Sequence, residues 1–170
     1  ASWYPNGFGS NQITVGNDNT GSCDAGFRFL RAFIPNNAKI TNAVLACSFG
    51  SCEVSLYGGH VLSYRPTGHG PVLFVSAASE FERGKPIRGG IPVCWPWFGK
   101  RADGGPTHGL ARIADWTVVA TSYTNDYTEL TLGLKDSPET RTLWPHAFEL
   151  RLDIRIGDSL RLTLTSGNTD

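Results

Sequence analysis

The chain has 170 residues, of which 40% are hydrophobic and 18% are charged, and this is the composition of one folded domain with its own core. The 15 basic and 15 acidic residues cancel, so no net charge favours nucleic acid or an anionic membrane surface. No apolar run approaches the roughly 18–20 residues that a membrane-spanning helix needs.

The first 38 residues form a turn-rich segment, crowded with Asn, Gly, Ser and Asp, to which we assign no role. Within it we expect a short strand at Ile13–Val15 and an edge strand at Phe27–Ile34, ended by Pro35. The second unit, residues 39–170, has the pattern of a β-sandwich domain. The chain begins with Ala1 and has no methionine, which indicates a trimmed or processed start.

The expected cellular location follows from the trimmed or processed N-terminus and from the absence of an apolar run long enough to span a membrane. We expect a soluble protein that is cytoplasmic or, if a transit peptide has been removed, organellar, as in a chloroplast.

From Ile40 onward, short stretches rich in Val, Ile, Leu, Thr and Tyr alternate with turns, which predicts strands with one buried face. The predicted strands are Ala43–Ser48, Cys52–Tyr57, His60–Tyr64, Val72–Val75, Trp116–Tyr123, Thr128–Leu134, Glu149–Ile156 and Ser159–Thr165. Many short strands with turns between them indicate an all-β fold, a sandwich or barrel of antiparallel strands.

Two local signals are clearer than the rest. Gly157-Asp158 lies between two alternating strands and predicts a tight hairpin turn. Ser137–Trp144 predicts one short helix, with Ser137 as N-cap, Pro138 as first helical residue and Pro145 beyond its end.

The four cysteines are too few for a disulfide scaffold and match no zinc pattern. Cys47 and Cys52 could close a small loop if they face each other, and buried reduced thiols are the alternative. The chain contains no nucleotide-binding glycine motif and no nucleophile elbow, and we expect neither a cofactor nor a metal.

The segment Gly84–Arg112 is unlike ordinary strand or helix, because it holds seven glycines and four prolines. Arg88 is followed by two glycines, whose amides could bind a ligand oxygen beside the guanidinium. His108 lies in a turn, four residues before Arg112, so in an extended stretch both side chains would point the same way. An anion or sugar site is one interpretation, and surface salt bridges with a surface histidine are the other.

Trp95 and Trp97 alternate in the same segment, on either side of Pro96. One in the core and one lining a cleft would suit both the usual role of tryptophan and a sugar-binding role.

Three ordered motifs, Leu56–Tyr64, Lys85–Gly99 and His108–Arg112, closely resemble the D-hexose-6-phosphate mutarotases, also called glucose-6-phosphate 1-epimerases, of the aldose 1-epimerase superfamily. The resemblance covers about residues 40–170. It implies a galactose-mutarotase-type β-supersandwich and an enzyme that interconverts hexose 6-phosphate anomers by general acid–base catalysis.

Carried over by position, the resemblance makes four residues the expected substrate-binding set. Arg88 and Arg112 would bind the substrate, including its phosphate, and His108 would support the sugar. Thr107 would add a contact at a place where some relatives carry a larger polar side chain.

The family's catalytic histidine, in a His-Thr-Tyr-Phe-like motif, and its glutamate base both follow the strand that ends near Asp170 here. Neither motif is present, so we assign no catalytic residue and expect a partial sandwich. Two hypotheses follow: a mutarotase domain that interconverts anomers only when the missing half is supplied, or a non-catalytic structural or binding subunit of an assembly. Both allow a protein partner that covers the incomplete sandwich.

Overall fold

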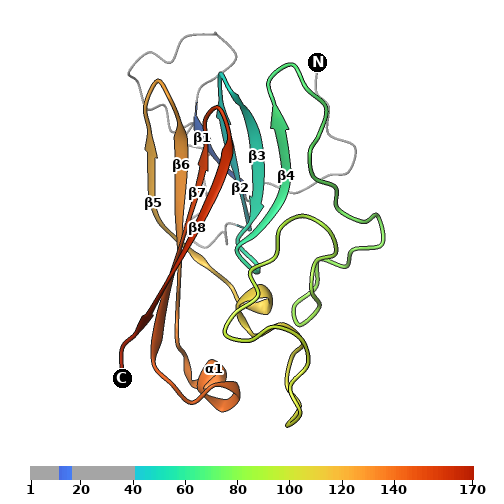
Figure 1. The fold of residues 1–170 in the computed structure, drawn as a ribbon, viewed down its shortest axis with the longest axis vertical. Coiled ribbons are helices and arrows are strands. Elements are labelled where there is room, and N and C mark those ends of the chain that lie inside the picture. The colour runs from blue at the N-terminus through green and yellow to red at the C-terminus, as the bar shows by residue number, and fades with distance from the viewer. Residues whose placement is uncertain (1–11, 17–40) are drawn as a thin grey trace.

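The fold is formed by two four-stranded sheets, in a computed structural model that describes residues 12–16 and 41–170 (Figure 1). The strand expected at Phe27–Ile34 lies outside the described residues. Within them, no helix is long and apolar enough to cross a membrane.

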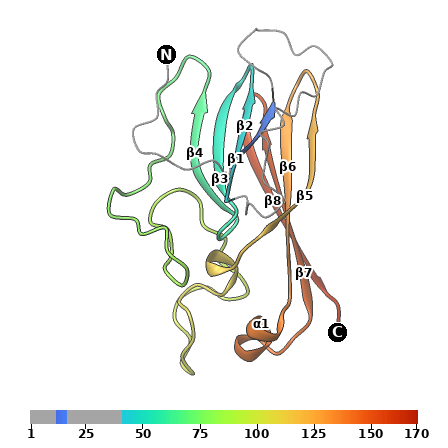
Figure 2. The same cartoon turned by 180° about the vertical axis from the view of Figure 1, so that it is seen from behind.

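The first sheet has the order β1-β2-β3-β4, with each strand beside its neighbour in sequence. The strands are β1 (Gln12–Gly16), β2 (Asn42–Cys47), β3 (Gly50–Ser55) and β4 (His60–Pro66). β1 pairs with β2 in parallel, which departs from the expected antiparallel arrangement, and the other pairs are antiparallel (Figure 2). The short strand expected near Ile13 is confirmed.

The second sheet is an antiparallel meander in the order β5-β6-β7-β8. Its strands are β5 (Thr117–Tyr123), β6 (Thr128–Lys135), β7 (Phe148–Ile156) and β8 (Leu160–Asn168). Along β7, buried and more exposed residues alternate without a break, as the sequence predicted. Ile156 pairs with Leu160, so the hairpin turn contains three residues rather than the predicted two.

One hydrophobic core joins the inner faces of both sheets. Leu45 and Val54 from the first sheet are fully buried in the same cluster as Leu132 and Ile154 from the second. The all-β sandwich prediction is therefore confirmed, and burial of these faces is the main source of its stability.

Two strand predictions need correction. Val72–Val75 is not a strand: Val72 makes one backbone bond to Tyr64 of β4, Val75 makes one isolated bridge to Gly89, and the Phe74 side chain is 76% exposed. β3 ends at Ser55 rather than Tyr57, because the chain turns at Gly58 and Gly59, which have φ +83° and +56°.

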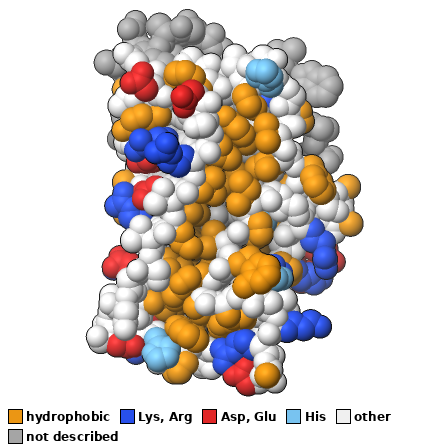
Figure 3. Space-filling model, viewed as in Figure 1, with side chains coloured by type: hydrophobic (Ala, Val, Ile, Leu, Met, Phe, Trp, Pro, Cys, Tyr) orange, Lys and Arg blue, Asp and Glu red, His pale blue; other side chains and the backbone are white. Residues whose placement is uncertain are grey.

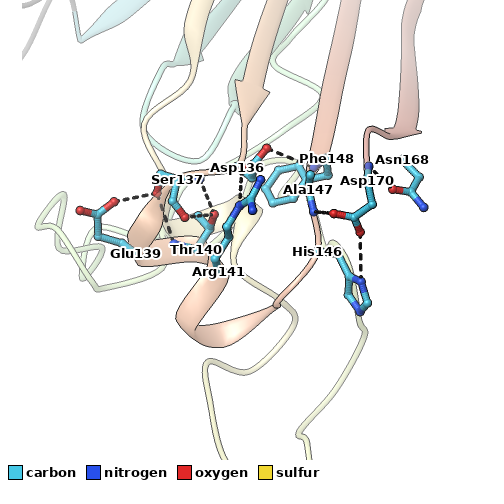
Figure 4. Close-up of polar contacts among 10 residues, drawn as sticks. All are labelled: Asp136, Ser137, Glu139, Thr140, Arg141, His146, Ala147, Phe148, Asn168 and Asp170. Atoms are coloured by element: carbon cyan, nitrogen blue, oxygen red, sulfur yellow. Dashed lines mark hydrogen bonds and ion pairs between the residues drawn. The ribbon is translucent and has the colours of Figure 1, made fainter.

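The predicted helix is α1 (Pro138–Leu143), and its N-terminus is capped as expected (Figure 4). The Thr140 N–H donates to the Ser137 hydroxyl at 3.2 Å, and the Ser137 N–H donates to the Thr140 hydroxyl at 2.8 Å. This reciprocal pair satisfies donors that a helix start leaves free.

His146 follows the helix and has a packing role. Its ring packs at a tilt of 58° against Trp144, with centroids 4.8 Å apart. Its Nδ1 lies 3.3 Å from the Asp170 carboxylate (Figure 4). The same carboxylate accepts the Ala147 N–H at 2.8 Å, so these contacts tie the last described residue to the start of β7.

Cys47, Cys52 and Cys94 are free thiols, and the loop-closing disulfide is not formed. Cys52 pairs across the hairpin with Leu45, whereas Cys47 pairs with Gly50, so the two cysteines are not cross-strand neighbours. Burial raises the pKa of the Cys52 thiol to about 12, which is the environment of an unreactive core cysteine.

β8 is an edge strand of nine residues that pairs only with β7 in the described part of the chain. Leu160 and Leu162 are half-buried, and Leu164 is 41% exposed. Figure 3 shows apolar side chains gathered in a band down the face of the molecule seen in Figure 1. A long free edge beside exposed apolar surface is a typical place for further protein to pack.

Candidate functional site

The candidate site residues lie between β4 and β5, in a run that belongs to neither sheet. In Figure 1 this run, coloured green to yellow, loops along the outside of β4 and below the strands. Two isolated bridges fasten it to the turn before β4 and to β4 itself, Tyr57 to Asp115 and Val61 to Ile91, and two more join parts of the run to each other, Val75 to Gly89 and Trp95 to Gly109. The bridges place the Arg88 motif against the start of β4 and the Arg112 motif against the turn before it.

The Arg88 turn is built by its glycines. Gly89 has φ +98° and Gly90 has φ +60°, and a Cβ on Gly89 would lie 2.3 Å from the Phe74 carbonyl oxygen. Only glycine fits such a close approach with positive φ. The Gly90 N–H already donates to Phe74 at 2.8 Å, so this amide is not available to a ligand, contrary to the expectation from sequence.

Arg88 itself is fixed through its backbone and open at its side chain. Its N–H donates to the Ser79 hydroxyl and its carbonyl accepts from the same hydroxyl, both at 3.0 Å. The side chain is exposed, and over residues 41–170 its guanidinium has neither a hydrogen-bond partner nor an ion-pair partner. A positioned cation without a counter-anion is suited to binding an anionic group.

His108 has φ +65°, the one positive φ among the described non-glycine residues. Its N–H donates to the Gly99 carbonyl at 2.8 Å, and its Nδ1 accepts the Gly99 N–H at 3.0 Å. Since Nδ1 accepts, the neutral ring carries its proton on Nε2, which can donate to a ligand oxygen. The Phe98 ring meets the imidazole edge-on at 4.4 Å, and half-buried Thr107 precedes it in the chain.

The geometry that links His108 to Arg112 differs from the one expected. Arg112 lies in a single 3-10 turn, η1 (Ala111–Ile113), so the extended stretch that would align the two side chains is absent. The N–H groups of Ile113 and Ala114 close the turn by donating to the carbonyls three residues before them, at 3.1 and 3.4 Å. Its start is anchored because the N–H groups of Leu110 and Ala111 both donate to the Trp95 carbonyl, at 2.9 and 3.2 Å.

Arg112 is half-buried and packs against the turn before β4. A Cβ on Gly58 would lie 2.6 Å from the Arg112 carbonyl oxygen, and the Gly58 N–H donates to Ala114 at 2.7 Å. Like that of Arg88, its guanidinium makes no hydrogen bond or ion pair within the described ranges. The two cations are therefore held on separate loops that contact the same short turn.

Sequence reasoning assigned no role to His60, the first residue of β4. Its Nε2 lies 2.7 Å from the Gly89 carbonyl oxygen, which places it directly behind the Arg88 turn. Burial lowers the pKa of His60; the Gly89 hydrogen bond raises it and the Arg112 charge lowers it. The two glycines before it, Gly58 and Gly59, were the signal that the backbone here approaches other segments closely.

The two tryptophans contact protein groups. Trp95 packs on the core beside Phe148, with ring centroids 4.6 Å apart. The Arg101 guanidinium lies 4.6 Å over the Trp97 ring, and Trp144 lies 6.2 Å from it. Trp97 therefore supports the loop of residues 97–108, and its N–H donates to Pro106 at 3.0 Å.

Chemically, this arrangement offers two guanidinium groups and one imidazole N–H donor on glycine-built loops. In the described part of the chain, no cluster of three His, Cys, Asp or Glu residues could hold a metal ion. The groups present are suited to recognising an anionic or polyhydroxylated ligand.

Known proteins were compared with the chain by sequence. The protein named "Putative glucose-6-phosphate 1-epimerase" from Escherichia coli (strain K12) is 43% identical over 113 residues, covering 66% of this chain and 38% of that protein. The protein of the same name from Cenchrus ciliaris is 36% identical over 124 residues, covering 67% of this chain and 36% of that protein. The chain thus spans well under half the length of these relatives.

Solved structures give the same family and fold. The crystal structure described as a putative mutarotase from Salmonella typhimurium is 36% identical, with a TM-score of 0.70, and the match covers 73% of this chain and 42% of that one. The galactose mutarotase related enzyme from Lactobacillus acidophilus, at 20% identity and a TM-score of 0.56, matches in fold, over 75% of this chain and 44% of that one. These matches confirm the predicted galactose-mutarotase-type sandwich.

The family itself is identified by its sequence profile. The profile described as aldose 1-epimerase matches residues 45–170, which include both sheets from β2 onward and all four candidate binding residues. The expected resemblance is thereby confirmed, and this chain belongs to the aldose 1-epimerase family.

Proposed function

We propose that this chain provides the sugar-phosphate-binding wall of a hexose-6-phosphate mutarotase. The observation that carries the proposal is the pair of guanidinium groups, Arg88 and Arg112, on loops held against one turn without counter-anions in the described part of the chain. The names of the relatives from Escherichia coli and Cenchrus ciliaris support a phosphorylated hexose as the ligand.

Each binding residue has a distinct role in this proposal. The guanidinium of Arg88 binds the phosphate of the hexose 6-phosphate, because it is exposed and its planar donors match phosphate oxygens. Arg112 adds a second positive charge. His108 donates its Nε2–H to a sugar hydroxyl, and Thr107 offers its hydroxyl beside it.

The proposal predicts that the 170-residue chain binds glucose 6-phosphate and discriminates it from glucose. A charge-assisted Arg–phosphate interaction contributes about 1.5–3 kcal/mol, so glucose 6-phosphate should bind at least about tenfold more tightly than glucose. Titration of the 15N-labelled chain would give both dissociation constants and show whether the amides of residues 88, 108 and 112 shift together. Equal affinity for the two sugars would contradict the proposal.

We further propose that interconversion of the anomers needs polypeptide equivalent to the part of the relatives that this chain does not match. The chain covers 38% of the Escherichia coli protein, and the β8 edge beside exposed Leu164 is the surface at which that polypeptide would continue the sandwich.

A complementation experiment tests this requirement. Co-expression with the unmatched part of the Escherichia coli relative should accelerate exchange between the glucose 6-phosphate anomers, measured by NMR exchange spectroscopy, whereas each piece alone should match buffer. Acceleration by the 170-residue chain alone would contradict the requirement.

The free β8 edge and its apolar band favour a second candidate, a non-catalytic subunit that packs in a larger assembly. It differs from the first in two outcomes: the chain would bind no sugar phosphate, and the complemented protein would not exchange the anomers.

A further inference from the structure

His60 is a buried titratable side chain directly behind the proposed site. It is 1% exposed, begins β4, and is the largest fully buried polar side chain in the described part of the chain. A histidine in a core position is costly to bury unless its ring nitrogens are used, so its contacts indicate its role.

The main contact of His60 is with the Arg88 turn. Its Nε2 lies 2.7 Å from the Gly89 carbonyl oxygen, and since a carbonyl can only accept, Nε2 carries the proton and donates. The imidazole also lies close to the next residue, because a Cβ added to Gly90 would be 2.8 Å from the same Nε2. The imidazole therefore holds the carbonyl of the peptide that joins Gly89 to Gly90.

The turn needs such support, because its own residues provide little. Gly89 and Gly90 both have positive φ and no side chains, so their peptides can rotate more freely than those of other residues. Backbone bonds hold its two ends, from Ser76 N–H to the Arg88 carbonyl at 2.9 Å and from Ile91 N–H to Val61 at 2.9 Å. The peptide between them, which joins Gly89 to Gly90, is held through both of its polar groups: its N–H donates to the Phe74 carbonyl at 2.8 Å, and its carbonyl accepts from His60 at 2.7 Å.

The same histidine is close to the second cation. The turn that leads into it, at Gly58, packs on the Arg112 backbone, and the positive charge of Arg112 acts on the imidazole. A single buried residue thus contacts the Arg88 turn and borders the segment that carries Arg112.

We propose that His60 is a positioning residue for the phosphate-binding arginine, acting through the hydrogen bond from its Nε2 to the Gly89 carbonyl. It does not touch the ligand. By fixing the Gly89 peptide it limits the directions in which the preceding Arg88 can present its guanidinium, and so reduces the ordering that binding requires. This inference rests on the proposed function and deepens it.

The test compares two variants of His60 with a matched surface variant. His60→Leu removes the donor and keeps an apolar side chain in the core, and His60→Gln keeps an N–H near the position of Nε2. His69→Leu makes the same chemical change at an exposed histidine in a turn. Each is titrated with glucose 6-phosphate, and 15N spectra follow the Gly89 and Gly90 amides.

His60→Leu should weaken glucose 6-phosphate binding about fivefold, the loss expected for one hydrogen bond, and should shift and broaden the Gly89 and Gly90 amides. His60→Gln should restore affinity to within about twofold, and His69→Leu should bind like the wild type. A purely structural role would shift amides throughout the core and would not be rescued by glutamine.

Failure of the proposed function and failure of the positioning role give different results. If the wild-type chain binds no glucose 6-phosphate, the proposed function fails and this inference with it. If the wild type binds, and folded His60→Leu binds equally well or His60→Gln loses as much as His60→Leu, the proposed function stands and the positioning role is overturned.

Discussion

Replacing Gly109 by alanine should destabilise the protein more than any other single methyl group added to the loops. A Cβ at this position would lie 2.0 Å from the Trp95 carbonyl oxygen and 2.3 Å from the carbonyl carbon, and the residue has φ +78°. Both atoms belong to backbone that a side-chain rotation cannot move aside. We expect a loss of about 3–5 kcal/mol in the free energy of unfolding, from overpacking together with the cost of positive φ for alanine.

Gly104→Ala is the matched control for this clash. Gly104 has φ +87°, but a methyl group there would have no neighbouring atom within 4 Å, so alanine meets the same backbone strain without the contact. Its expected cost is about 1–2 kcal/mol. Urea denaturation of both variants separates the two contributions, and equal midpoints would show that the close approach of the two loops is not maintained in solution.

The clash expected in Gly109→Ala would also affect the candidate site, because Gly109 allows the segment before Arg112 to approach Trp95 closely. Its close approach allows the N–H groups of Leu110 and Ala111 to reach the Trp95 carbonyl, and these bonds anchor the start of the 3-10 turn that carries Arg112. The loop of residues 95–99 then also supports His108 through Gly99. Loss of this contact should weaken ligand binding even where the sandwich remains folded.

The sandwich strands could be predicted from sequence because their signal is local. β7 alternates buried and more exposed residues along its whole length, and it pairs with β8 through a tight turn. The sequence signal for α1 was equally local, since the two adjacent residues Ser137 and Pro138 mark where the helix begins. Val72–Val75 has similar β-branched residues, but it makes only single backbone contacts, from Val72 to β4 and from Val75 to Gly89, and periodicity does not show whether a ladder continues.

The site could be predicted only in part, for a related reason. Residue types pointed to Arg88, His108 and Arg112, because glycine-rich segments with cations are typical of anion sites. Their arrangement depends on contacts between residues distant in sequence: His60 with Gly89, and Gly58 with Arg112. Such long-range contacts leave no periodic pattern in the sequence.

The divided support of the two cations has a functional consequence. One loop carries Arg88 and contacts His60, and another carries Arg112 and contacts Gly58, so the distance between the charges depends on the turn that leads into β4. A phosphate and a sugar ring are separate parts of one ligand. We therefore expect changes in that turn to alter discrimination between sugar phosphates more than affinity for inorganic phosphate.

Replacing Arg88 by alanine should abolish most of the preference for a phosphorylated sugar. Its guanidinium is exposed and has no partner in the described ranges, so the change removes a ligand contact without breaking a contact within the fold. We expect glucose 6-phosphate to bind about 10–100-fold more weakly, the loss of one charge-assisted phosphate interaction. The affinity for unphosphorylated glucose should change less than about twofold, and the free energy of unfolding by less than about 0.5 kcal/mol.

Two further variants make the Arg88 result specific. Arg65→Ala removes the same charge from an exposed side chain at the end of β4 and should bind glucose 6-phosphate like the wild type. Arg88→Lys keeps the charge but loses the planar pair of donors, and should recover only part of the affinity. These titrations also report salt dependence, since a lost phosphate contact lowers the sensitivity of binding to ionic strength. If Arg88→Ala and Arg65→Ala weakened binding equally, general electrostatic attraction rather than a defined phosphate contact would hold the ligand.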